Sequence, residues 1–242
     1  MPAWPGRFAR PGGRRPGDPR PAGRRGLPGV PVRVALGVAV LVTAVAVAYF
    51  TPVFAVRTVR VDGAAAVPED QVRAALGVPE GRSMLRIDTT AMAARVASIP
   101  KISTARVQRV FPGTVRVTVR ERTPVLWFTG QGGAHLVDAE SVEYAVEPAP
   151  PGVPELAAAG AAPAIRRVAV TVLTALPPAL TAEVAKVEAR TASDIVLTLR
   201  DGRTVLWGGA DDAARKAAVV GPLLTRDGTI FDVSSPNLVT VR

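Results

Sequence analysis

The sequence predicts an α+β protein with one N-terminal transmembrane helix and two folded modules. Three observations lead to this fold class. A basic leader rich in Pro and Gly precedes a single long apolar run at residues 34–50. A strand-helix-helix-strand-strand pattern then occupies residues 54–122, and residues 123–242 hold many short strand patterns with helices between them. We therefore expect a β-α-α-β-β module followed by a module built on a mixed antiparallel sheet with helices.

The leader, residues 1–31, is predicted to be a disordered basic cytoplasmic tail. Of the net charge of +10, residues 1–33 contribute +7, from eight Arg against one Asp. The leader has too few apolar residues to build a core. We expect its charges to act as a topology signal, and contact with anionic lipid or a cytoplasmic partner is the alternative. A nucleic-acid partner is not expected, because such binding needs an aromatic-studded or folded basic surface, and the leader has only Trp4 and Phe8 as aromatic residues.

Residues 32–53 are predicted to form the transmembrane helix. The run 34–50 has one polar residue, Thr43, and a helix of that length spans about 26 Å, close to the thickness of a bilayer core. Because the Arg residues precede the run, the N-terminus is expected in the cytoplasm and both modules outside, as in a single-pass type II membrane protein. A cleaved signal peptide is the alternative, since residues 44–48 offer small-x-small cleavage patterns. The long segment before the run and the length of the run both favour an uncleaved anchor.

The first module, residues 54–122, shows the periodicities of its elements directly. In the strand expected at 56–61, Val59 and Val61 alternate with Arg60. Helices are expected at 68–77, opened by Pro68 and stopped by Gly77, and at 88–97, capped by Asp88. Further strands are expected at 104–110 and 115–119, on either side of a turn at 111–114.

At this point the chain resembles the POTRA module of the bacterial cell-division family FtsQ, called DivIB in other lineages. That family opens the module with a hydrophobic-x-x-Val-x-Val-x-Gly strand, turns through aromatic-Pro-x-Thr and closes with Glu-Arg-x-Pro. The matching residues are Val56, Val59, Val61 and Gly63, then Phe111, Pro112 and Thr114, then Glu121, Arg122 and Pro124. The order and spacing of the three motifs, just after a single apolar run, carry the resemblance.

The second module, residues 123–242, is expected to be rich in strands. Strands are expected at 125–129, 135–138, 142–146, 184–190, 195–199, 203–207, 229–233 and 237–241, with helices at 164–176 and from 211 onward. Residues 147–163 contain five Pro and are expected to form a surface loop. The segments LTLRDGRTVLWGG and GTIFDVSSPNLVTVR resemble the C-terminal domain of the same family. Gly221-Pro222, which interrupts the late helix, and Ser234-Ser235 depart from the family pattern.

The residue inventory argues against catalysis. No Cys excludes a disulfide framework, an iron–sulfur site and a thiol nucleophile, and a single His, His135, excludes a multi-histidine metal centre. Ser98-x-x-Lys101 matches a penicillin-binding motif only formally, because Pro100 breaks the required helix. We therefore expect no enzyme activity, cofactor, metal or small-molecule substrate. Two alternatives stay open: an anchored or secreted cell-wall enzyme with an unrecognised site, and a POTRA-type transport chaperone.

Without catalysis, the exported portion is expected to act by binding, and an open strand edge offers one means. The resemblance implies a scaffold that links early and late division proteins at the septum and regulates septal peptidoglycan synthesis. It implies FtsB-like and FtsL-like membrane partners and the septal peptidoglycan synthase complex. The residues expected to contact a partner lie in and beside the last two strands: Ile230, Phe231, Asp232, Val233, Leu238 and Val239. For the apolar ones, a place in the core is the alternative; Trp127 and Trp207 are expected to be core residues.

Overall fold

The computed structural model describes residues 30–50, 54–78, 81–157 and 162–242. The chain divides into one unit that ends at Ala48 and a second that runs from Tyr49 to Arg242. Helix α1 (Val30–Phe50) belongs mainly to the first unit, and its side chains from 32 to 47 are exposed. Among the described residues, no helix meets the length and apolarity that crossing a bilayer requires. The span at 32–53 stays a prediction, and the tail, apart from residues 30 and 31, lies outside the described residues.

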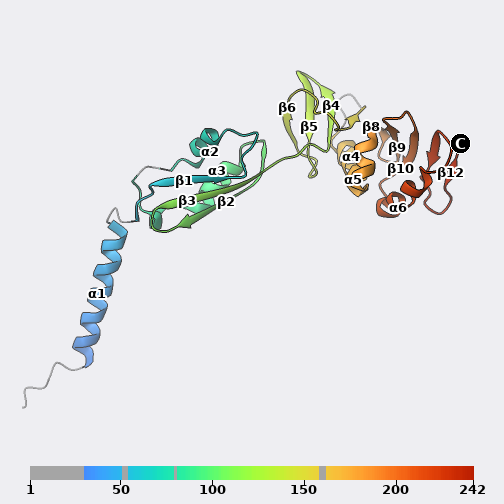
Figure 1. Ribbon diagram of the computed structural model, residues 1–242. Helices are drawn as coiled ribbons and strands as arrows, with labels where there is room; N and C mark the ends of the chain where they lie inside the picture. The colour runs from blue at the N-terminus through green and yellow to red at the C-terminus, as the bar shows by residue number, and fades with distance from the viewer. Residues whose placement is uncertain (1–29, 51–53, 79–80, 158–161) are drawn as a thin grey trace, which may run out of the picture. The chain divides into compact units, whose positions relative to one another are not determined.

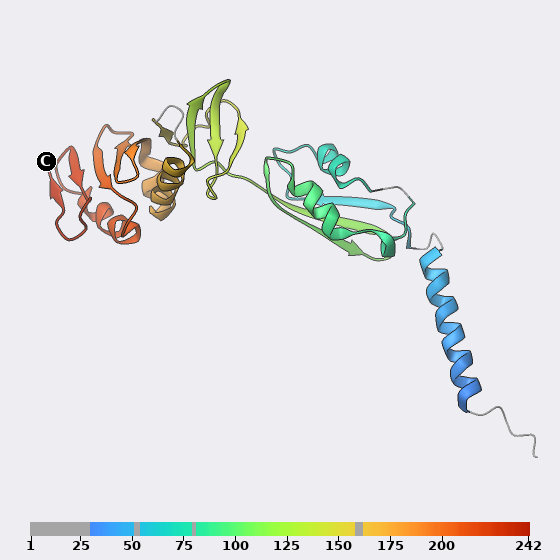
Figure 2. The same ribbon diagram turned by 180° about the vertical axis from the view of Figure 1, so that it is seen from behind.

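The first module is a three-stranded sheet with its two α-helices on one face (Figure 2). The strand order is β1-β3-β2, with β1 parallel and β2 antiparallel to the central strand. The elements are β1 (Thr58–Asp62), α2 (Glu69–Leu76), the 3₁₀ turn η2 (Met84–Arg86), α3 (Thr89–Ala97), β2 (Ile102–Val110) and β3 (Thr114–Glu121). The predicted β-α-α-β-β order is correct, and only the turn η2 was not predicted.

Local sequence signals explain the boundaries of these elements. Gly77 ends α2 at φ 58°, a left-handed conformation that glycine adopts without steric cost. Asp88 caps α3 by accepting hydrogen bonds from the backbone N–H groups of Thr90 and Ala91, at 2.9 and 3.0 Å. Along β3, Val residues turn to the helices while Arg and Thr residues face away from them. The face of the sheet opposite the helices is thus polar and exposed.

The second module is a nine-stranded mixed sheet (Figure 1) with the order β12-β11-β10-β9-β8-β7-β4-β5-β6. Its strands are β4 (Leu126–Gly130), β5 (Gly133–Val137), β6 (Glu143–Val146), β7 (Glu155–Leu156), β8 (Val184–Thr191), β9 (Asp194–Leu199), β10 (Thr204–Gly208), β11 (Ile230–Asp232) and β12 (Thr240–Val241). Three neighbouring pairs are parallel, namely β4 with β7, β7 with β8, and β10 with β11. The other neighbours are antiparallel, so the predicted mixed sheet is present.

The prediction of a surface loop at 147–163 is wrong for residues 155 and 156. Two of its residues form β7, which lies between β4 and β8 and joins the two halves of the sheet. Leu156 is buried in the core, and the side-chain N–H of Trp127 donates to the carbonyl of Val153 at 3.2 Å. Trp127 is therefore half-buried against this segment. A two-residue strand has no periodicity that a sequence pattern could show.

Three helices complete the second module: α4 (Pro163–Ala175), α5 (Pro178–Glu183) and α6 (Ala213–Leu223). The core lies between them and the sheet and contains Trp207, which is fully buried as expected. The expected interruption at Gly221-Pro222 does not occur, because α6 continues through Pro222 and ends one residue later. Pro222 has no N–H to donate to the carbonyl of Ala218, so it removes one hydrogen bond in the last turn of the helix and leaves the earlier ones in place.

Candidate interaction sites

The last two strands form one end of the large sheet. β11 pairs with β10 on one side and with β12 on the other, so it is an inner strand. Of the two last strands predicted at 229–233 and 237–241, the first is thus covered on both sides. β12 is the edge, and within the described part of the chain no strand pairs with its outer side.

Arg242 exchanges both backbone hydrogen bonds with Ile230, at 2.9 and 3.0 Å. Val241 stands opposite Phe231, in the alternate position of the antiparallel ladder. In such a ladder, residues at alternate positions turn their N–H and C=O groups away from the neighbouring strand. The backbone of Val241 thus faces the open side, where another strand could pair with it.

The six residues predicted for partner binding gather at this end of the sheet in different environments. Phe231 and Val233 are fully buried and belong to the core, and Val239 packs partly against it. Ile230 is 40% exposed and Leu238 is 75% exposed. Asp232 accepts hydrogen bonds from the backbone N–H and the hydroxyl of Ser234, at 3.0 and 2.7 Å.

The side chains of Ile230 and Leu238 are therefore exposed, whereas those of Phe231 and Val233 lie in the core. The contact roles of all six residues remain predictions.

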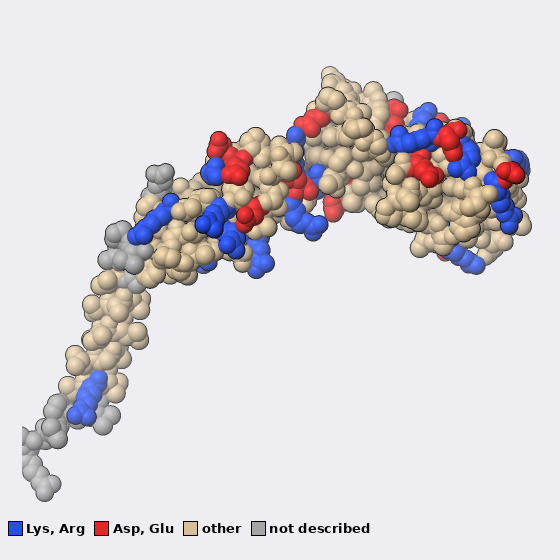
Figure 3. Space-filling model, viewed as in Figure 1, with Lys and Arg blue, Asp and Glu red and all other residues tan. Residues whose placement is uncertain are grey.

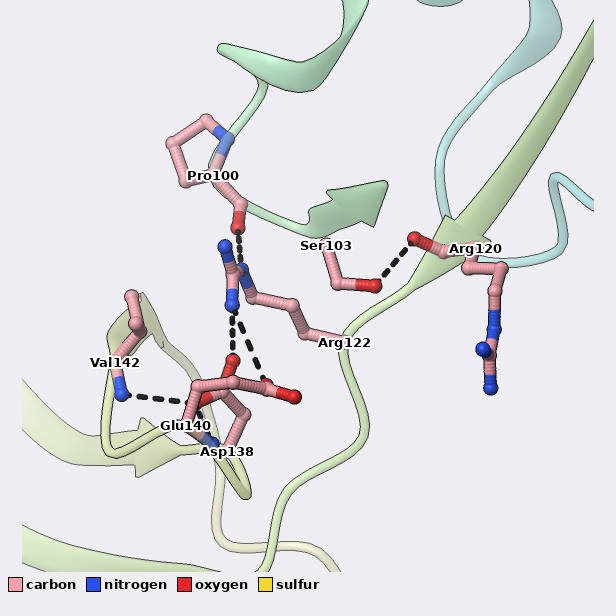
Figure 4. Close-up of polar contacts among 7 residues, drawn as sticks. All are labelled: Pro100, Ser103, Arg120, Arg122, Asp138, Glu140 and Val142. Carbon is pink, nitrogen blue, oxygen red and sulfur yellow. Dashed lines mark hydrogen bonds and ion pairs between the residues drawn. The ribbon is translucent and has the colours of Figure 1, made fainter. Parts of the chain in front are cut away.

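A second polar cluster joins the two modules around Arg122 (Figure 4). The backbone N–H of Arg122 donates to the carbonyl of Lys101 at 2.8 Å, and the Nε of Arg122 donates to the carbonyl of Pro100 at 3.2 Å. Its Nη1 forms an ion pair with Asp138 and lies 3.8 Å from Glu140. A second ion pair, between Lys101 and Glu147, also joins the two modules.

Asp138 is almost completely buried, and its second carboxylate oxygen is also occupied. Oδ1 accepts from the backbone N–H groups of Glu140 and Val142, at 3.0 and 2.8 Å. A buried carboxylate with a cation and two backbone donors is well satisfied. The turn between β5 and β6 is thus held by Asp138, and the same carboxylate forms the ion pair with Arg122 of the first module.

Glu121 precedes Arg122 and points back into the first module. Its carboxylate accepts hydrogen bonds from the backbone N–H groups of Ala65, Ala66 and Val67, at 2.8 to 3.0 Å. Partial desolvation alone would raise the pKa of Glu121. The three N–H donors and the charge of Lys101 outweigh it and hold that pKa below its ordinary value. The Glu-Arg pair of the closing motif therefore ties the end of β3 to both modules.

His135 holds a hairpin together. Its Nδ1 donates to Glu143 at 2.7 Å, its Nε2 donates to the carbonyl of Gln131 at 2.9 Å, and its ring stacks on Phe128 at 5.0 Å. The hydrogen bond with Glu143, followed by that with Gln131, raises the pKa of His135 above its ordinary value. Because both ring nitrogens face acceptors, the charged imidazolium fits this site. Its partners give His135 a structural role.

Comparison with known proteins agrees with the two modules. Residues 54–122 match the family model described as POTRA domain, FtsQ-type, and residues 125–234 match cell division protein FtsQ/DivIB, C-terminal. A relative from Mycobacteroides abscessus, named Cell division protein FtsQ, is 47% identical over 80% of this chain and 63% of its own length. The match with the Mycolicibacterium smegmatis relative of the same name, at 43% identity, also covers 63% of that protein. The chain thus spans less than two thirds of these two curated relatives.

A shorter relative is matched over nearly its whole length. Cell division protein FtsQ of Corynebacterium glutamicum is 31% identical over 87% of this chain and 98% of its own. The two family models lie side by side and together cover most of the chain, in the order that the motifs predicted. The chain therefore belongs to the FtsQ family of bacterial cell division proteins.

Proposed function

We propose that the chain is a single-pass membrane scaffold of the division machinery, with residues 32–53 crossing the membrane and both modules outside the cytoplasm. The apolar run within α1 and the Arg-rich segment before it support this topology. In this proposal the protein works at the division septum of the cell membrane, where it links early and late division proteins. It regulates septal peptidoglycan synthesis through its partners, without enzyme activity, cofactor or small-molecule substrate of its own.

The proposed contact for the FtsB-like partner, which comes with an FtsL-like protein, is the outer side of β12. The observation that carries it is the backbone of Val241, which faces the open edge of the sheet. A partner strand added there would gain main-chain hydrogen bonds, and exposed Ile230 and Leu238 would supply side-chain contact. Through these partners the scaffold reaches the septal peptidoglycan synthase complex.

The test is a proline at the outward-facing position. Val241→Pro removes the N–H that a partner strand would accept from, while the hydrogen bonds between β12 and β11 stay intact. Val241→Thr is the matched control, because it keeps the N–H and the β-branched shape. Co-purification of the full chain with the FtsB-like partner should fall at least about tenfold for the proline variant and little for the control. Equal capture by both variants would contradict strand addition at β12.

Val233 is the wrong place for such a proline, although it is one of the six predicted residues. Its N–H donates to the carbonyl of Leu206 at 3.0 Å, inside the sheet. A proline there would disrupt the module itself and would not report on the partner. The scaffold role is tested separately by a fluorescent N-terminal fusion, which should be enriched at the septum. Peptidoglycan hydrolase or transferase activity of the purified chain would instead favour the cell-wall enzyme.

A further inference from the structure

The exposed apolar side chains of the first module gather at one end of it. Leu85 is 44% exposed, Val110 is 36% exposed and Phe111 is 53% exposed. Val110 ends β2, Phe111 begins the turn to β3, and Leu85 lines the same hollow of about 460 Å³ as Phe111. The ring of Phe111 meets that of Phe54 edge-on, with centroids 5.7 Å apart. We call these four residues the tip patch.

Arginine residues lie beside the tip patch and on the neighbouring face of the sheet. Arg57 is tied to the β2–β3 turn, since its backbone N–H donates to the carbonyl of Gly113 at 2.8 Å. Arg60 and Arg116 are neighbours in register on the exposed face of the sheet, and Arg109 is exposed beside Val110. A second hollow, of about 540 Å³, lies beside Arg57. The described residues that line these two hollows include no Asp or Glu.

The two modules also differ in net charge. Residues 54–122 contain twelve Lys and Arg against six Asp and Glu, whereas residues 123–242 contain ten against thirteen. Figure 3 shows Lys and Arg side chains exposed on the first module, together with a few Asp and Glu, and further Lys and Arg on the second module. The nearest acid in the exposed sheet face, Asp62, lies 3.8 Å from Arg116 and offsets only one of these charges. The tip patch therefore lies in the basic module and combines exposed apolar groups with cations.

The tip patch begins shortly after α1 in the sequence. Only three residues, 51–53, separate Phe50 from Phe54 in the sequence, and an extended chain of that length reaches about 14 Å. Apolar and aromatic side chains ringed by Arg are typical of surfaces that lie at a membrane interface. Guanidinium groups bind phosphate oxygens with short charge-assisted hydrogen bonds.

We propose that the tip patch docks on the outer surface of the bilayer, on phospholipids with anionic headgroups. Leu85, Val110 and Phe111 enter the interface, and Arg57 and Arg60 contact the headgroup phosphates. The inference rests on the proposed anchoring of α1, which brings the patch to the bilayer, and it adds a second membrane contact made by the folded module itself. Such a contact holds the first module at a defined distance from the membrane.

The absence of Cys in the chain allows single fluorescent labels. The full chain is reconstituted in phosphatidylcholine vesicles, with and without phosphatidylglycerol, and a nitroxide on the lipid serves as quencher. Thr114→Cys places the label beside the tip patch, at the start of β3. Ser193→Cys, exposed in the β8–β9 turn, is the control, and Val40→Cys within α1 reports anchoring separately.

The label at 114 should be quenched most strongly in vesicles with phosphatidylglycerol, and high salt should reduce the difference. Arg57→Gln with Arg60→Gln should lower the ratio of docked to undocked protein about tenfold or more, since each Arg near an anionic surface contributes about a factor of five. Leu85→Ser with Val110→Thr should lower it in both vesicle types. The matched pair Arg215→Gln with Arg226→Gln removes two exposed charges from the second module and should leave the ratio unchanged.

Quenching at 114 that equals quenching at 193 would overturn the proposal, provided that the label at 40 is quenched. An unquenched label at 40 would overturn the anchor and, with it, the inference. If both pairs of Arg→Gln substitutions lower the ratio of docked to undocked protein equally, net charge and not the tip patch determines docking. If 114 stays unquenched in lipid but crosslinks to a protein in cells, the patch belongs to a protein partner and the lipid proposal fails.

Discussion

Arg122→Met should weaken the junction between the two modules. The substitution keeps the aliphatic volume and removes the guanidinium that pairs with Asp138 and donates to Pro100. Removing one partner of a buried ion pair costs about 3–5 kcal/mol, because the other charge is left uncompensated. Asp138 keeps its hydrogen bonds from Glu140 and Val142, so we expect the lower end of that range, about 3 kcal/mol of unfolding free energy.

Neighbouring variants separate this ion pair from general effects of charge. Arg120→Met removes a cation two residues away whose side chain is exposed and points away from the cluster (Figure 4). Its cost should stay within about 0.5 kcal/mol. Asp138→Asn removes the buried charge and, combined with Arg122→Met, should cost less than the two single substitutions together, by about 1–2 kcal/mol.

The assay is urea unfolding of the full chain together with amide hydrogen exchange. The amide of Val142 donates to Asp138, so its protection should fall in Arg122→Met and persist in Arg120→Met. Exchange resolves the junction even when the two modules unfold in separate transitions. If Arg122→Met costs no more than Arg120→Met and leaves the protection of Val142 unchanged, the ion pair does not stabilise the junction.

Three further variants test other contacts. Glu121→Ala should lower the unfolding free energy in urea by about 1–2 kcal/mol at neutral pH. Because the pKa of Glu121 is lowered in the folded protein, its carboxylate adds to the unfolding free energy above the ordinary pKa of 4.5. This contribution is lost as the pH falls through the lowered, folded-state pKa. The charged His135 contributes to the unfolding free energy below its ordinary pKa of 6.5, and this contribution is lost as the pH rises through its raised folded-state pKa. His135→Gln should therefore lower the unfolding free energy more at about pH 5.5 than at about pH 8.5. Leu156→Asp should cost more than about 3 kcal/mol in urea, because it buries a charge in β7.

The elements that the sequence predicted well are those with short-range causes. A glycine at a left-handed position ends α2, an aspartate caps α3, and alternating Val and Arg residues define β3. Each signal lies within a few residues of the element it determines. The first module, which consists mainly of such elements, was therefore predicted almost completely.

The errors lie where pairing depends on distant segments. β7 is a strand only because it pairs with β4 on one side and with β8 on the other. Its two residues lie in a stretch whose prolines indicate a loop. Which of the last two strands forms the edge also depends on pairing, because the chain returns after Asp232 and β12 pairs on the outer side of β11. The contact of Arg122 with Asp138 likewise crosses sixteen residues and a module boundary. None of these partners has a local signal in the sequence.

One strand carries both contacts that position the first module. β3 starts beside the tip patch at Thr114 and ends at Glu121, after which Arg122 reaches the second module. Its eight residues span about 26 Å of extended chain, and strand geometry resists changes in that length. Glu121 binds backbone N–H groups of the first module, whereas Arg122, just after the strand, contacts both Pro100 of the first module and Asp138 of the second. If the tip patch holds one end of β3 at the bilayer, the ion pair at its other end sets how far from the membrane the second module begins.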